Sequence, residues 1–183
     1  MKRIFLFKII ILMSFFICST AYASDMPLTN LSGKQIASLL NSAEMQSKLS
    51  RNFGRLSDFK FLEYKNGRNV YTATIEGGTL VNGHFFIKED TNGKLYDIAC
   101  IYNMNDVGMQ KKCINIISFY LVCAGIDDKI ASNILTNIKF GYNDAISQVY
   151  VPSLGGFLTM VGGVKRELPD HMLLVFSVES RHF

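Results

Sequence analysis

The sequence is poor in the residue patterns on which metal and cofactor sites depend. It contains only three histidines, His84, His171 and His182, and none belongs to a His-Glu-x-x-His pattern. A Cys-x-x-Cys pair is absent as well. Because zinc sites are usually built on such spacings, we expect no metal site and no cofactor.

Nucleophile and phosphate-binding motifs are also missing. The nearest approach to the Gly-x-Ser-x-Gly elbow of serine hydrolases lies at 152–156, but it lacks the first glycine. The glycine pairs at 77–78, 155–156 and 162–163 do not extend into a nucleotide-binding pattern. We therefore predict hairpin turns at these glycines and no catalytic residue. A small hydrolase that uses a Cys or His is the alternative.

A basic excess is missing from most of the chain. The sequence has 19 Lys and Arg against 15 Asp and Glu, but three of the basic residues are Lys2, Arg3 and Lys8. Beyond residue 23 the balance is 16 to 15, a formal charge of about +1. Nucleic-acid-binding domains carry a clustered basic face, so nucleic acid is excluded as a partner.

Residues 1–23 have the order of a secretory signal peptide. Basic residues come first, an apolar stretch runs from Ile9 to Cys18, and the small residues Ala21 and Ala23 follow. We expect cleavage after Ala23 and a periplasmic or secreted protein. An uncleaved anchor is the alternative, because the apolar stretch counted from Ile4 approaches the roughly 20 residues of a membrane span. No later stretch reaches that length, so no integral span is expected after cleavage.

Residues 24–183 are expected to form one α+β domain. No repeat or linker divides these 160 residues, which suffice for a hydrophobic core. A capping box at Ser32 and Gln35 predicts a first helix that ends before Gly54. Four strands of an antiparallel meander are predicted at Phe59–Tyr64, Asn69–Glu76, Thr79–Lys88 and Lys94–Tyr102.

Two helices and a second group of strands are predicted next. One helix is capped by Asn105 or Asp106, ends near Gly125 and is apolar almost all round, which is typical of a buried helix. The other is capped by Asp127 and ends near Gly141. The C-terminal strands are predicted at about Ala145–Val151, Phe157–Val161, Val164–Leu168 and Met172–Ser180. Separate runs of strands and helices favour an antiparallel sheet packed against about three helices.

Three cysteines remain after the signal peptide: Cys100, Cys113 and Cys123. Cys113 and Cys123 lie about 15 Å apart along one predicted helix, which is too far for a disulfide. If that helix folds back over the preceding strand, Cys113 comes closest to Cys100. We therefore predict a Cys100–Cys113 disulfide, with three buried thiols as the alternative.

One uncharged segment is a candidate contact with another protein. Between Tyr150 and Val161 the chain has no charged residue, and the candidate residues are Tyr150, Leu154, Gly155, Gly156 and Phe157. The alternative is that Leu154 and Phe157 belong to the core. Size, export and missing catalytic motifs favour a non-enzymatic protein-binding domain, such as an inhibitor or immunity protein against an envelope enzyme or toxin. An accessory subunit of a secretion, pilus or conjugation assembly is the second hypothesis.

Overall fold

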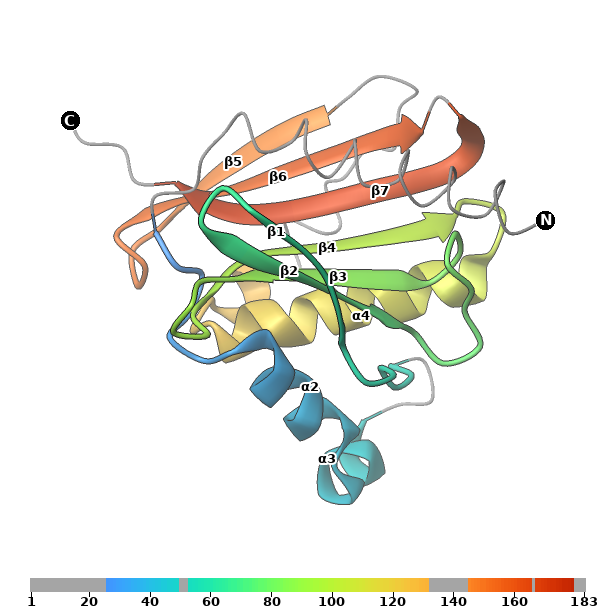
Figure 1. Cartoon of the computed structure of the whole chain (residues 1–183), viewed down its shortest axis with the longest axis horizontal. Helices are drawn as coiled ribbons and strands as arrows, with labels where there is room; N and C mark the ends of the chain where they lie inside the picture. The colour runs from blue at the N-terminus through green and yellow to red at the C-terminus, as the bar shows by residue number, and fades with distance from the viewer. Residues whose placement is uncertain (1–25, 50–52, 132–144, 166, 180–183) are drawn as a thin grey trace.

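The computed structural model describes residues 26–49, 53–131, 145–165 and 167–179, and it has a mixed α+β fold (Figure 1). A seven-stranded antiparallel sheet carries helices on one face. In chain order the elements are α2 (Gly33–Asn41), α3 (Ala43–Lys48), β1 (Lys60–Lys65), β2 (Arg68–Thr74), β3 (His84–Glu89), β4 (Leu95–Asn103), α4 (Val107–Cys123), β5 (Ala145–Val151), β6 (Gly156–Lys165) and β7 (Leu168–Glu179).

The strand order is β1-β2-β3-β4-β7-β6-β5. The first four strands lie side by side in sequence order, and β7 then pairs with β4 along seven residue pairs, from Asp97↔Ser177 to Asn103↔His171. The last strand of the chain, β7, therefore lies inside the sheet, between β4 and β6, while β1 and β5 form the two edges.

The N-terminal helix begins as predicted and ends early. Ser32 accepts from the backbone N–H of Gln35 at 3.1 Å, and the Gln35 side chain accepts from the N–H of Ser32, which confirms the capping box. The prediction of one helix up to Gly54 is wrong, because the helix is interrupted at Ser42, whose backbone is extended. The Ser42 hydroxyl caps the start of α3 at Met45, so a local side-chain bond replaces helical continuation.

Two predicted strand boundaries differ from the structure. β3 begins at His84 rather than at Thr79, because Thr79 and Asn82 bond each other's backbone in a turn. The predicted turn at 162–163 is absent, and both glycines lie inside the single long strand β6. A Cβ atom at Gly162 would come within 3.0 Å of Leu174 on β7. This glycine serves close packing rather than a turn.

The central helix α4 is capped at both ends as the sequence predicts. The Asp106 carboxylate accepts from the N–H of Met109 at 2.9 Å, and Gly125 follows the helix with a φ of +83°. Only one stripe of the helix is buried, however, and Val107 and Val122 are exposed. The apolar middle expected to be buried, residues 114–122, is buried or half-buried apart from Val122.

Apolar residues are buried on both faces of the sheet. The larger cluster lies between the sheet and helices α2 and α4 and includes Phe85, Ile98 and Tyr120. The smaller cluster is on the opposite face and comes from strands only: Val70, Phe86, Ala99, Ile101, Leu173 and Val175. All six residues of β3 are buried, as expected for a strand covered on both sides.

The helix predicted after Asp127 lies mostly outside the described residues. Its start is described: the Asp127 carboxylate accepts from the N–H of Lys129, and the Asp127 carbonyl accepts from the N–H of Ala131, both at 2.9 Å. This is the expected geometry of a helix N-cap.

Candidate functional site

The predicted contact segment forms the hairpin between β5 and β6. Tyr150 and Phe157 face each other across the two strands, with their ring centroids 5.3 Å apart and an interplanar angle of 62°. Tyr150 is 52% exposed, while Phe157 is half-buried. Such an edge-to-face pair adds stability beyond its buried area, so the hairpin holds an accessible aromatic side chain in a defined orientation.

The turn of this hairpin is tied to the body of the domain. The N–H of Leu154 donates to the carbonyl of Val151 at 3.0 Å, and Gly155 takes a φ of +63°, where glycine is favoured. The Ser153 hydroxyl donates to the carbonyl of Gly125 at 3.1 Å, just beyond the end of α4. Ser153 is thus a turn residue.

The five predicted contact residues do not share one environment. Tyr150 and Gly155 are exposed, but Gly156 is buried and Leu154 is half-buried against the main core. Leu154 and Phe157 were each predicted to be either contact residues or core residues. Leu154 packs against the main core, and the ring of Phe157 packs against the ring of Tyr150. The largest exposed side chain among the five is Tyr150, and Phe157 lies half-buried beside it.

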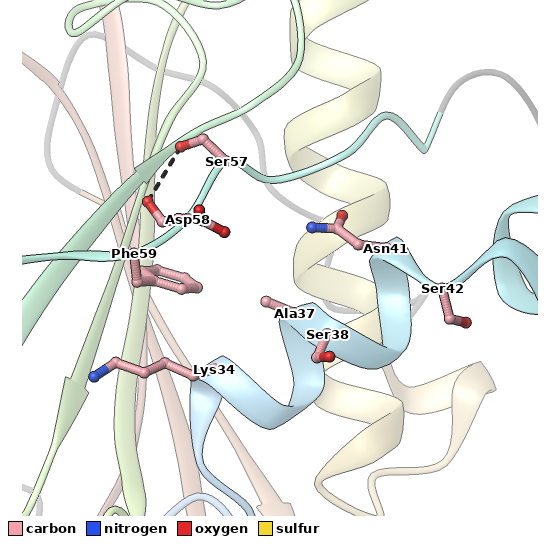
Figure 2. A pocket seen from close by; sticks show the side chains of 8 residues that line it. All are labelled: Lys34, Ala37, Ser38, Asn41, Ser42, Ser57, Asp58 and Phe59. Carbon is pink, nitrogen blue, oxygen red and sulfur yellow. Dashed lines mark hydrogen bonds between the residues drawn. The ribbon is translucent and has the colours of Figure 1, made fainter.

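A groove of about 680 Å³ lies between helix α2 and the chain that leads into β1 (Figure 2). Eight residues line it: Lys34, Ala37, Ser38, Asn41, Ser42, Ser57, Asp58 and Phe59. Figure 2 shows Lys34 and Phe59 at one end and Asn41 and Ser42 along the helix. No sequence motif indicated this groove, because its walls are 15 or more residues apart in the chain.

The polar groups of the groove hold the fold together. The Asn41 side chain bonds both the N–H and the carbonyl of Leu56, at 3.0 and 2.7 Å. The Ser57 hydroxyl accepts from the N–H of Thr74, and the Lys34 ammonium lies 3.4 Å from the ring centroid of Tyr71. These contacts tie α2 and the chain that leads into β1 to each other and to β2 of the sheet, which is a structural role.

The structure brings Cys100 and Cys113 together in the main core. Both are fully buried, on β4 and α4, and both belong to the main core cluster. Burial is the main cause that raises the pKa of the Cys100 thiol. Cys100, Cys113 and Cys123 are all free thiols in this structure, so the disulfide stays a prediction.

His84 is a hydrogen-bonded strand histidine. Its Nε2 contacts the Thr72 hydroxyl, and its Nδ1 lies 3.5 Å from the Thr74 hydroxyl. Burial lowers the pKa of His84 to about 4, so the ring is neutral near pH 7 and pairs with hydroxyl groups rather than with a carboxylate.

His84 and Cys100 lie on opposite faces of the sheet. His84 shares its face with Phe86 of the smaller cluster, whereas Cys100 belongs to the main core.

His182 is outside the described residues. Within the described ranges there is no group of three His, Cys, Asp or Glu side chains that would hold a metal. None of the described helices is long and apolar enough to cross a membrane.

Charged residues inside the sheet were not anticipated from the sequence. Lys88 and Asp97 form a buried ion pair at 2.6 Å between β3 and β4. The Glu89 carboxylate accepts from the N–H of Gly33 at the start of α2, at 2.6 Å, and burial raises the pKa of Glu89. Each of these charged groups has an ion-pair or hydrogen-bond partner inside the fold, as buried charged groups require.

No protein-family model, curated protein or solved structure matches this chain. Its function is therefore inferred from its own residues and their geometry.

Proposed function

We propose that this chain is exported to a periplasm or secreted and acts without enzymatic chemistry by binding another protein. Its class would be an inhibitor or immunity-type protein that neutralises an envelope enzyme or toxin. The observation that carries this proposal is the Tyr150–Phe157 pair, where a half-exposed tyrosine rests on a half-buried phenylalanine. Protein interfaces draw most of their binding energy from a few such aromatic anchors.

The environment of the cysteines supports the same proposal. Cysteine nucleophiles act as thiolates beside a base. Here Cys100 is fully buried with a raised pKa, and burial also raises the pKa of Cys123. The hydrolase alternative needs a Cys–His pair, and the described residues place His84 and Cys100 on opposite faces of the sheet.

Affinity capture of the exported protein from envelope extract, followed by mass spectrometry, would identify the partner. We then expect the double variant Tyr150→Ser, Phe157→Ser to bind that partner more than tenfold more weakly, a loss of more than about 1.4 kcal/mol. The variant should also lose some stability, about 0.5–1.5 kcal/mol from the aromatic pair, so binding is measured well below its melting temperature, where the protein is folded. Leu154 is left unchanged because it packs against the core.

The matched control is the pair Phe61→Ser, Tyr64→Ser on the opposite edge strand, where both side chains are also exposed, at 58% and 60%. This control should bind normally. Equal binding by both double variants would contradict the proposed site.

Turnover of a substrate by the purified protein, abolished by changing His84 or a cysteine, would contradict the proposed function. A stable one-to-one complex favours an inhibitor, whereas co-fractionation with a large membrane assembly favours the accessory subunit.

A further inference from the structure

The two edges of the sheet differ in their protection against pairing with another strand. Edge strand β1 carries Lys60 and Lys65 at its ends and Glu63 between them. Its pairing with β2 also shifts register between Phe61 and Glu63. Charged residues, lysine above all, and bulges are the usual features by which proteins block edge-to-edge pairing.

Edge strand β5 has none of these features. Its sequence, Ala145–Val151, contains no charged residue and no proline. Seven consecutive residues pair with β6 without a register shift, from Ala145↔Gly162 to Val151↔Gly156. In the described part of the chain β5 pairs with β6 alone, and Ser147 and Gln148 are exposed. A regular, uncharged edge of this kind is a template for a further strand.

We infer that β5 pairs antiparallel with β5 of a second copy of this chain, about a two-fold axis, so that the two sheets join into one. In a two-fold contact of this kind, the strand of one copy lies against the same strand of the other copy. Because β5 carries no charge, the pairing brings no like charges together in any register. The same contact at β1 would place Lys60 and Lys65 of the two copies at each other's ends, and like charges across strands are destabilising.

The size of this contact sets its strength. A pair of seven-residue strands is smaller than the roughly 20–30 residues a side of a standard interface. We therefore expect a weak dimer whose population rises with concentration. A continuous sheet keeps the same face of both copies on one side, so the two Tyr150–Phe157 pairs would share one surface. The inference does not depend on the proposed function.

Sedimentation velocity of the exported protein between about 10 and about 500 μM tests this inference, since a small interface is expected to dissociate in this range. We expect the weight-average sedimentation coefficient to rise with concentration. Ser147→Lys should weaken self-association at least tenfold, because it supplies the charge that protects β1. The matched control Phe61→Lys adds a lysine to the exposed part of β1 and should dimerise like the unchanged protein.

Hydrogen exchange of the unchanged protein provides a second readout that needs no variant. Backbone amides of β5 should become more protected as concentration rises, while those of β1 should not. The inference is overturned if the protein stays monomeric throughout, if Ser147→Lys associates normally, or if Phe61→Lys is the variant that dissociates. Partner capture that depends on Tyr150 and Phe157 would survive each of these results. Loss of capture with an intact dimer would count only against the proposed function.

Discussion

At the scale of single residues, His84 shows how burial rather than charge sets protonation. The ring is 5% exposed, packs edge-on against Phe86 at 4.9 Å, and contacts the hydroxyls of Thr72 and Thr74. A neutral imidazole can both donate to one hydroxyl and accept from the other. Protonation would place an unpaired charge in this environment.

We predict that His84 makes the protein less stable in acid. The unfolded histidine takes up a proton below about pH 6.5, whereas the folded one does so only near pH 4. The free energy of unfolding should therefore fall as the pH is lowered from about 6.5 to about 4, by about 3 kcal/mol from this residue. His84→Gln should remove most of this loss in urea unfolding at pH 7 and pH 4.5.

Other titrating groups, such as Glu89 and Asp106, are common to both proteins and cancel in this comparison. An NMR titration of the His84 ring gives a direct check, and it should show no protonation above about pH 5. A normal midpoint near 6.5, or equal acid sensitivity of both proteins, would contradict the prediction.

At the scale of elements, the contact between β4 and α4 follows from the positions of two cysteines. A helix rise of about 1.5 Å per residue places Cys113 over Cys100 when the helix folds back on its strand. The structure has this packing, with both thiols fully buried in the main core. Residue spacing along the chain was enough here because the connection of 104–106 is short.

We predict that Cys100 and Cys113 are joined by a disulfide in the protein recovered from an oxidising compartment. Each thiol loses one hydrogen atom, and two electrons and two protons pass to a disulfide oxidant such as oxidised glutathione. Because neither thiol is exposed, oxidation must precede the final packing of α4. The bond should contribute about 2–4 kcal/mol to stability.

Peptide mapping without reduction should recover the two cysteines linked, and Cys123→Ser should not change this result. Reduced Cys100→Ser protein, unable to form the bond, should unfold at lower urea concentration than the oxidised protein. Three free thiols in the exported protein, or a link to Cys123, would contradict the prediction.

Other element boundaries depended on contacts that are distant in sequence. The break between α2 and α3 occurs inside an apolar repeat that indicated one helix, and Asn41 just before it is bonded to Leu56. The glycines at 162–163 were predicted as a turn, yet Gly162 lies opposite Leu174 in the sheet. Local patterns do not report a partner strand, so these boundaries could not be read from the sequence.

At the scale of the whole molecule, the described domain begins after the segment predicted to direct export. The first described residues are already part of the fold, since the N–H of Leu28 donates to the carbonyl of Leu95 at 2.7 Å. A cut after Ala23 would leave this contact intact.

We predict that the exported protein begins at Ser24, because small residues at positions 21 and 23 precede the expected cleavage point. N-terminal sequencing of the protein from the periplasm or medium is the measurement. Ala23→Leu should slow processing, while Tyr22→Leu, which leaves the small residues unchanged, should not. A sequence that begins at Met1 would contradict cleavage and favour the retained anchor.

The sequence by itself determined the α+β class, the helix cap at Ser32, a cap at Asn105 or Asp106, and the neighbourhood of Cys100 and Cys113. Each of these depends on residues close together in the chain, where spacing and side-chain chemistry act directly. Only the tertiary structure decided that β7 lies between β4 and β6, that Lys88 pairs with Asp97, and that β1 and β5 are the edges. These features depend on which distant strands meet, and the free energy of that choice comes from packing of the whole sheet rather than from any one segment.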